Sequence, residues 1–507
     1  MQKKVMAVAV AAALAAPAVA LAQGSSVQIY GGLSVSFEFA EAKSADTTST
    51  QNTNSALPGY NSSSVRGANL LTTQAGATAG VGAVGGGNLA STGVNEPSRT
   101  RTQAAGSNFG IRGREDLGNG LYVGFQAEAS IAMGGVTAVS GGGNGLFAGW
   151  RNSGVWFGGR WGEVGLGLWD LPFNLNQTTG AAHAPYANAS TSMSAGLLGG
   201  GLGATAAGTS SGQDFAQFCP GGSFSNNTAS TCFTNALSFH RRQSNQIWYQ
   251  SPTWAGFRGR VSYGATSGAT GNATNDGANF PSTVKAQLWG AGVSYTLGGL
   301  YAGVGWEKHD NYITTAARLT GAAAGGFALG GQNAAGVTST LALIPVGSAT
   351  PGLAGNGISG DDSTGWNVNL RYTFGFGLSI GGYYEWVKWD MNYSQSVTGN
   401  TTQLKRDAWR LDAAYQLGAH TFGIQYGQGN QIKGSVVGGN FNGDGTGTNM
   451  WIFGYAYSLS KRSSLFAYYT LVDNDLNSRS SGIVFGGIGP NAGADPQYLG
   501  AGIRHLF

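Results

Sequence analysis

The chain has 507 residues, of which 88 are glycine and only 10% are charged, and its formal charge at pH 7 is +4. So small a charge, which falls to +2 once two lysines near the N-terminus are removed, excludes a protein whose main ligand is nucleic acid. Long amphipathic helical patterns are almost absent and no proline-rich linker divides the chain. We therefore expect one β-rich domain, although this length ordinarily suggests two or three.

The N-terminal segment has the layout of a secretory signal. A pair of lysines precedes an apolar run over 5–18, and an Ala-Leu-Ala cleavage motif ends at Ala22. This pattern predicts a signal peptide over 1–22 and a mature single domain over 23–507; the alternative is a short membrane anchor. No later stretch holds about 20 consecutive apolar residues, so we expect no transmembrane helix in the mature chain.

The clearest structural pattern is a hairpin over 107–130. In its second limb Leu121, Val123 and Phe125 alternate with polar or small residues, which is the side-chain period of a β-strand. The glycines of the segment 116–120 allow the tight turn that joins the two limbs. The sequence therefore predicts an antiparallel hairpin with one apolar face.

Alternating segments of this kind recur along the mature chain. We predict about sixteen strands, over 27–39, 107–118, 121–131, 147–159, 162–170, 244–251, 255–266, 284–297, 300–308, 366–374, 377–392, 403–417, 419–429, 448–459, 463–472 and 497–507. One segment is irregular, because Tyr383, Tyr384, Trp386 and Trp389 fall on both of its faces. A bulge or an aromatic interior could explain it.

The connections between these segments alternate in length. Short turns alternate with long polar loops, of which the longest cover about 41–106, 170–243 and 309–361. All long loops then emerge at one end of the sheet. In lipid an unpaired backbone group costs several kcal/mol, so a membrane sheet has to close. We predict an all-β transmembrane antiparallel barrel with short periplasmic turns and long extracellular loops; the alternative is a secreted β-solenoid or large sandwich.

The chain has two cysteines, Cys219 and Cys232, in a polar stretch. In the oxidising compartment that the leader predicts, we expect a disulfide between them that stabilises the fold by roughly 3 kcal/mol. The alternative is two free thiols, and two lone cysteines are a poor metal site.

Four motifs resemble the Gram-negative general porin family, in particular its beta-proteobacterial type. Ser107–Glu128 is similar to the opening hairpin of that family, and Asn245–Phe257 to the segment after its constriction loop. Leu459–Leu465 is similar to the penultimate hairpin, and Gly502–Phe507 to the last strand. In that family the barrel-assembly machinery reads the terminal phenylalanine, here Phe507.

The resemblance implies a homotrimeric outer-membrane porin with sixteen strands and with the third long loop, 170–243, folded into the pore. It implies a water-filled channel for the passive diffusion of small hydrophilic solutes and ions. The expected partners are outer-membrane lipid, the barrel-assembly machinery during biogenesis, and the permeating solutes and ions. No nucleic acid is expected.

The predicted lumen is more basic than acidic, so we expect a mild anion preference. The predicted pore-lining residues are Arg112, Arg114, Glu128, Arg258, Arg260, Lys285, Arg371, Arg410, Arg241, Arg242, Asp170, Asp214, Trp248 and Asn108. Asn108, Leu168 and Trp248 stand where related sequences often carry a basic residue. Alternatively, Arg410 pairs with Asp412, and Arg114 belongs to a solvated turn.

Two other functions fit less of the sequence. Five aromatic residues could form a stacking ladder for uncharged or sugar-like solutes: Tyr122, Trp156, Trp248, Tyr383 and Trp389. The long loops could instead serve a surface adhesin or a structural outer-membrane protein. The five histidines lack ligand spacing, and neither a nucleophile elbow nor a phosphate loop occurs. We therefore expect no enzyme, no catalytic residues, no metal and no cofactor.

Overall fold

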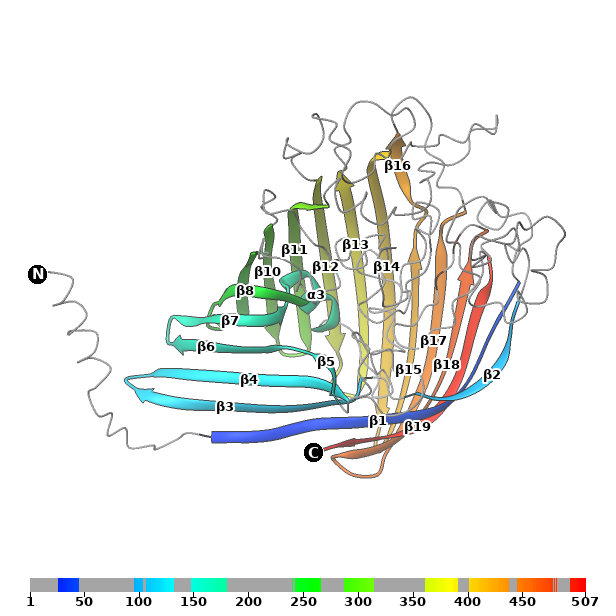
Figure 1. Cartoon of the computed structure of the whole chain (residues 1–507). Coiled ribbons are helices and arrows are strands. Elements are labelled where there is room, and N and C mark those ends of the chain that lie inside the picture. Colours follow the sequence, from blue (N-terminus) through cyan, green and yellow to red (C-terminus); the bar gives the residue numbers. More distant parts are fainter. Residues whose placement is uncertain are drawn as a thin grey trace, which may run out of the picture.

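The computed structural model describes residues 26–44, 95–103, 106–131, 147–179, 239, 242–265, 287–313, 361–390, 401–436, 445–476, 478, 480 and 493–507. Most of these residues lie in β-strands (Figure 1). Within these ranges one helix occurs, α3 (Pro172–Thr179). No helix in the described ranges has both the length and the hydropathy that a membrane span requires.

The described residues form one sheet of 19 strands. Its strands are β1 (Ser26–Lys43), β2 (Glu96–Gln103), β3 (Asn108–Gly118), β4 (Leu121–Ile131), β5 (Phe147–Trp150), β6 (Ser153–Gly159), β7 (Gly162–Asp170), β8 (Arg242–Gln250), β9 (Phe257–Ala265), β10 (Gln287–Leu297), β11 (Leu300–Ile313), β12 (Asp361–Thr373), β13 (Leu378–Asp390), β14 (Thr401–Leu417), β15 (His420–Gly429), β16 (Lys433–Val436), β17 (Thr448–Ser458), β18 (Ser463–Asn474) and β19 (Asp495–Leu506).

The sheet closes on itself. All pairs are antiparallel, and β1 pairs with β19 on one side and with β2 and β3 on the other. Three short strands lie beyond longer ones against a shared neighbour: β2 beyond β3, β5 beyond β6, and β16 beyond β15. The strands therefore fill sixteen positions of a closed barrel, as predicted. Closure pairs the backbone groups that an open edge would leave without partners.

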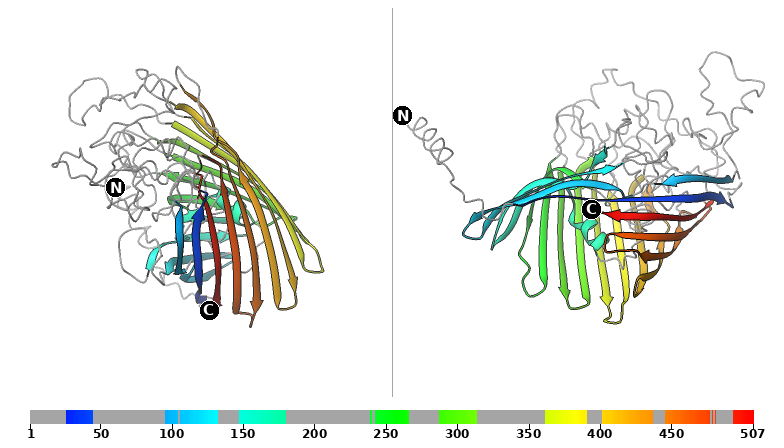
Figure 2. Two further views of the ribbon diagram at one scale, coloured as in Figure 1. Left: turned by 90° about the vertical axis from the view of Figure 1, so that its right-hand side faces the viewer. Right: turned by 90° about the horizontal axis from the view of Figure 1, so that it is seen from below.

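The strands of the barrel are strongly tilted, and the short turns lie at one end of the barrel. In Figure 1 strands β3 and β4 cross the direction of β10–β14, as expected for tilted strands on different walls of a barrel. Figure 2 shows the turns of the β12–β13 and β14–β15 hairpins at the same end of their strands. In the β3–β4 turn Gly118, Asn119 and Gly120 have φ values of 86°, 52° and 79°, a conformation that favours glycine and asparagine.

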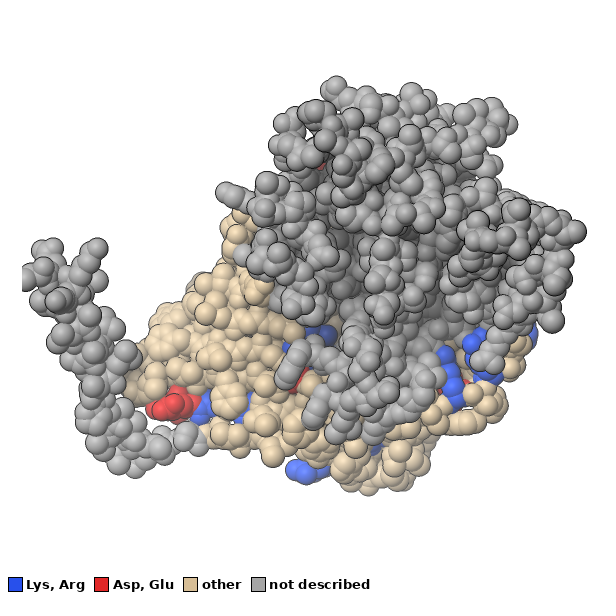
Figure 3. All heavy atoms as spheres, viewed as in Figure 1, with Lys and Arg blue, Asp and Glu red and all other residues tan. Residues whose placement is uncertain are grey.

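The outer face of the sheet is apolar and the inner face is polar, which is the reverse of a soluble β-sandwich. Large apolar side chains are exposed on the outer face, for example Val293 (55%) and Leu370 (56%), while inward groups such as Glu38 and Asn367 are fully buried. The described surface in Figure 3 is correspondingly short of charged residues. Such an outer face fits contact with hydrocarbon.

Most predicted strand positions are confirmed, and their ends differ from the sequence-based bounds. β1 extends to Lys43, β2 occupies 96–103 inside the predicted loop 41–106, and β11 extends to Ile313. β16 lies within a stretch that we predicted as a polar loop. Hydrogen bonding to neighbouring strands, rather than local polarity, sets these ends.

The irregular aromatic segment has no bulge, so the first of the two explanations that we considered is wrong. β13 pairs with β12 and β14 without a shift in register. Tyr383 points inward and is buried, while Tyr384 and Trp386 are exposed on the outer face. Aromatic residues on both faces are therefore an ordinary alternation between the lumen and the outer surface.

A charge on the outer face is expected to be costly. Val293 lies at the middle of β10, so we expect Val293→Arg to destabilise the folded state by about 2–4 kcal/mol. Ser294→Arg, one residue later on the inner face, is the control and should cost little. The measurement is urea unfolding from lipid vesicles followed by tryptophan fluorescence. If both variants lost the same free energy of unfolding, the assignment of Val293 to the outer face and of Ser294 to the inner face would be wrong.

Candidate functional site

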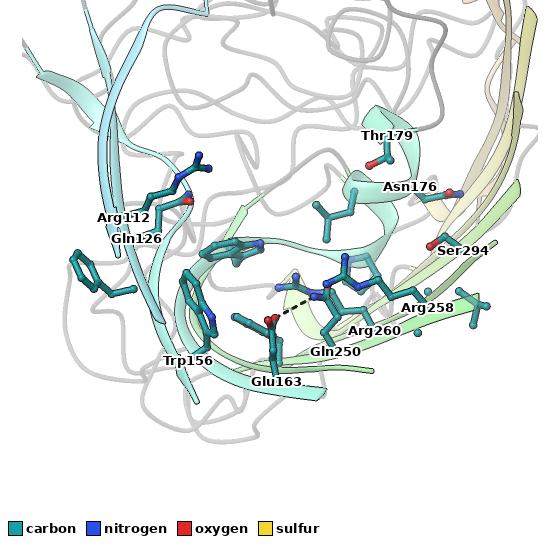
Figure 4. A pocket seen from close by; sticks show the side chains of 18 of the residues that line it. Arg112, Gln126, Trp156, Glu163, Asn176, Thr179, Gln250, Arg258, Arg260 and Ser294 are labelled. Atoms are coloured by element: carbon teal, nitrogen blue, oxygen red, sulfur yellow. Dashed lines mark hydrogen bonds between the residues drawn. The ribbon is translucent and has the colours of Figure 1, made fainter. Parts of the chain in front are cut away.

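A cavity lies against the inner face of the barrel, between α3 and strands of the wall that runs from β1 through β3 to β11. Its volume is about 580 Å³ (Figure 4). Its charged lining residues are Arg112, Arg114, Arg258, Arg260 and Glu163. Figure 4 shows Arg112 and Gln126 on one wall, with Arg258 and Ser294 on the wall opposite. Four guanidinium groups therefore share the cavity with one carboxylate.

Glycines on the wall allow α3 to lie flat against it. A Cβ atom at Gly290 would lie 2.7 Å from Cδ of Pro172, and one at Gly305 would lie 3.0 Å from Cα of Phe173. The absence of side chains at these positions thus creates the seat for the start of the helix.

Asparagines fix the helix once it is seated. Asn176 donates a hydrogen bond to Oδ1 of Asn367 (2.7 Å), and Nδ2 of Asn367 donates one to the carbonyl of Phe173 (2.9 Å). Asn369 donates to the carbonyl of Asn176 (2.8 Å), and the hydroxyl of Tyr301 donates to Oδ1 of Asn176 (2.9 Å). The first residues of the predicted in-pore loop 170–243 are therefore held on the inner face of β11 and β12. Residues 180–238 and 240–241 lie outside the described part.

Two cavity arginines lie on β3 and differ in how their charge is compensated. Arg112 donates two hydrogen bonds to the neutral amide of Gln28, at 3.1 and 2.9 Å. Arg114 pairs with Asp116 at 3.1 Å, and both side chains are about half exposed. The solvated turn pair that we considered for Arg114 is therefore present, whereas the amide leaves the charge of Arg112 uncompensated.

The other two cavity arginines lie two residues apart on one face of β9. Cζ of Arg260 lies 4.3 Å from the ring centre of Trp248, within the range of a cation–π interaction. Its Nε and Nη2 atoms are buried and have no hydrogen-bond partner among the described residues. Arg258 is exposed to the cavity and makes no hydrogen bond or ion pair with any described residue.

The single acid of the cavity is already engaged. Glu163 on β7 accepts a hydrogen bond from the Tyr122 hydroxyl at 2.6 Å and one from the Gln250 amide at 3.2 Å. Figure 4 shows the second of these bonds on the cavity floor. Neither arginine of β9 forms an ion pair with this carboxylate in the described structure.

Several predicted pore-lining residues are instead paired in the wall. Glu128 pairs with Arg151 and accepts a hydrogen bond from Tyr30. Asp170 pairs with Arg242 at 3.2 Å. Arg410 pairs with Asp412 at 2.8 Å, and both are fully buried, so the neutralised wall pair that we considered is present. These pairs contribute little net charge to the lumen.

The remaining predicted residues are scattered. Arg371 donates to the carbonyl of Thr179 at the end of α3 (3.2 Å), Trp248 is buried beneath Arg260, and Asn108 is half-buried outside the cavity lining. The others lie outside the described residues, namely Arg241, Lys285, Asp214, Cys219 and Cys232, as does the segment 1–22.

The predicted aromatic ladder does not form as a whole. Tyr122, Trp156 and Trp248 lie near the cavity, but Tyr383 is buried elsewhere, where its hydroxyl donates to Glu385 at 2.6 Å. The side chain of Trp389 is outside the described part.

The cavity also contains Glu163, Gln28 and Trp169, which we did not predict as pore-lining residues, although strand alternation places all three on the inner face. The contribution of Asn176 could not be inferred, because it depends on how α3 docks.

The C-terminus completes the closure of the barrel. The backbone of Phe507 exchanges hydrogen bonds with that of Gly31 at 3.1 and 3.2 Å, and its ring centre lies 6.4 Å from that of Phe109. Among the described residues no group of three or more His, Cys, Asp or Glu side chains could hold a metal ion.

Comparison with known proteins gives one family and a set of similar folds. A family model described as Gram-negative porin matches residues 7–396 and 379–477. The anion-selective porin from Comamonas acidovorans is 18% identical with a TM-score of 0.56, covering 96% of this chain and 100% of that one. OmpF of Salmonella typhi, in complex with daunomycin, is 12% identical with a TM-score of 0.48, covering 95% and 97%. The trimer form of OmpT from Vibrio cholerae is 13% identical with a TM-score of 0.49, covering 96% and 100%. A search of curated proteins found no match.

Proposed function

The chain belongs to the Gram-negative porin family, and we propose that its lumen conducts small hydrophilic solutes and ions passively with a mild preference for anions. As a member of this family it is a channel of the bacterial outer membrane, which it crosses many times with its strands. The size and charge of the lumen then decide what passes.

The observation that carries the anion preference is the charge of the cavity lining. Four arginines face one glutamate, and that glutamate already accepts two hydrogen bonds from neutral side chains. Three of the arginines, Arg112, Arg258 and Arg260, form no ion pair with a described residue. Uncompensated positive charge in a confined aqueous space concentrates anions. The similar Comamonas acidovorans porin is itself anion-selective, which supports the proposal.

We propose the same route of export and assembly that the sequence predicts. The chain would be exported through its leader 1–22 and fold as one barrel domain over 23–507, embedded in outer-membrane lipid as a homotrimer. The barrel-assembly machinery would recognise Phe507, whose backbone pairs with Gly31 in the closed barrel. The rest of the loop 170–243 would continue the constriction that α3 begins, with a disulfide between Cys219 and Cys232.

The zero-current potential across a planar bilayer tests this function. With purified protein and a KCl gradient, an anion-preferring channel makes the dilute side negative, because chloride crosses faster than potassium. A positive dilute side would overturn the anion preference. Absence of any conductance from folded protein would overturn the channel itself.

Release of α3 from the wall is expected to widen the channel. Asn367→Ala together with Asn369→Ala removes four hydrogen bonds to the helix, of which the three shorter ones contribute about 1 kcal/mol each. We expect a larger and noisier single-channel conductance, which bilayer recordings measure. Asn449→Ala on β17 serves as the control and should leave the conductance unchanged. An unchanged conductance in the double variant would show that α3 does not limit the channel.

A further inference from the structure

Three tryptophans form one cluster on the floor of the cavity. They are Trp156 on β6, Trp169 on β7 and Trp248 on β8, and their ring centres are 5.7–6.3 Å apart. All three line the cavity. We refer to them as the tryptophan cluster.

Two glycines, each on the strand beside one of these tryptophans, let the rings of Trp156 and Trp248 lie against the wall. A Cβ atom at Gly124 would lie 2.3 Å from the ring of Trp156, and one at Gly165 would lie 2.2 Å from the ring of Trp248. Trp248 is nearly fully buried in this way, whereas Trp156 and Trp169 are only partly buried. The cluster thus presents aromatic surface to the cavity.

The two arginines of β9 adjoin this aromatic surface. Arg260 lies over Trp248 at 4.3 Å and near Trp169 at 5.7 Å. Two of its buried nitrogen atoms lack a hydrogen-bond partner among the described residues, which is costly for a charged group. Figure 4 shows the side chains of Arg258 and Arg260 side by side, close to Gln250 and Glu163. An acceptor with two oxygen atoms could bond to both guanidinium groups.

We propose that the tryptophan cluster with Arg258 and Arg260 is a binding site for planar organic anions, that is, aromatic carboxylates. The carboxylate would lie at the two guanidinium groups and the ring would lie on Trp156 and Trp169. This proposal rests on the proposed channel function and deepens it by naming a solute class.

The composition of the site favours this class over sugars. The donors that face the tryptophans are charged guanidinium groups, which match a carboxylate better than a hydroxyl. Glu163, the one acid of the lining, is occupied by Tyr122 and Gln250. The cavity volume of about 580 Å³ falls within the range of roughly 300–1,000 Å³ that is usual for small-molecule sites. Binding has to stay weak, because a permeating solute also has to leave.

The test compares benzoate with cyclohexanecarboxylate, a non-planar anion of the same charge, as blockers of the KCl current through the full-length mature protein. We expect benzoate to reach half-maximal block at a concentration about three- to tenfold lower, the usual worth of an aromatic contact. Trp156→Leu should remove this preference. Arg258→Gln should weaken block by both anions.

Matched controls separate the site from general effects on the barrel. Trp366→Leu changes a tryptophan on the outer face, and Arg462→Gln changes an arginine in an exposed turn. Both should leave block by benzoate unchanged. If Trp156→Leu forms no channels, the comparison of the two anions on the unaltered protein and on Arg258→Gln decides the matter.

The outcomes distinguish the two proposals. Equal block by both anions in the unaltered protein, or a preference that persists in Trp156→Leu, overturns the aromatic site while an intact KCl conductance leaves the channel function standing. A protein that carries no KCl current contradicts the channel function, and the solute proposal is then overturned with it.

Discussion

Replacing Arg258 and Arg260 together with glutamine is expected to lower the ratio of chloride to potassium permeability by about fivefold. An anion that passes within about 4–5 Å of a unit charge gains roughly 1 kcal/mol even at the dielectric constant of water, which corresponds to about fivefold in local concentration. Neither arginine forms an ion pair with a described carboxylate, so their charge acts on the permeating ions. Zero-current potentials in KCl gradients measure the ratio.

The control for this variant is Arg462→Gln. Arg462 lies in the short turn before β18, at the end of the barrel, where salt solution screens its charge. It should leave the permeability ratio unchanged. If the double variant also kept the ratio of the unaltered protein, the cavity arginines would not determine selectivity.

The second large effect concerns the closure of the barrel. Glu38 on β1 is fully buried and accepts hydrogen bonds from Nε of Arg101 at 2.7 Å and from the hydroxyl of Tyr468 at 2.6 Å. The carboxylate therefore joins β1, near the start of the barrel, to β2 and β18. We expect Glu38→Ala to lower the free energy of unfolding by about 3–5 kcal/mol, because Arg101 is left buried without its carboxylate.

An exposed ion pair provides the comparison. Asp116 and Arg114 are 46% and 53% exposed, so Asp116→Ala should cost less than about 1 kcal/mol. Urea unfolding of both variants in the same lipid vesicles gives the difference. A loss below about 1 kcal/mol for Glu38→Ala, like that of an exposed pair, would show that this network does not hold the barrel closed.

The sequence alone predicts the barrel and much of its lumen, because strand alternation is a local property. Arg258 and Arg260 are two residues apart and therefore share a face, and the same rule pairs Arg410 with Asp412. The sixteen strand positions follow from the same period and from the turn glycines between segments.

The pairing of distant residues could not be predicted. Asp170 meets Arg242 only because β7 and β8 are neighbours across a long insertion. The seat of α3 depends on Gly290 and Gly305, whose role becomes visible only when Pro172 and Phe173 lie against them. Among the described residues the lumen therefore carries fewer unpaired charges than the sequence suggests, and three of them, Arg112, Arg258 and Arg260, line the cavity.

The central claim is that the apolar outer face of the barrel lies in lipid and surrounds a water-filled lumen. Single-channel recording of the purified mature protein in a planar bilayer tests this claim most directly. We predict discrete, repeatable current steps in KCl, with chloride as the main carrier. Folded protein that inserts into the bilayer and passes no current would contradict this account.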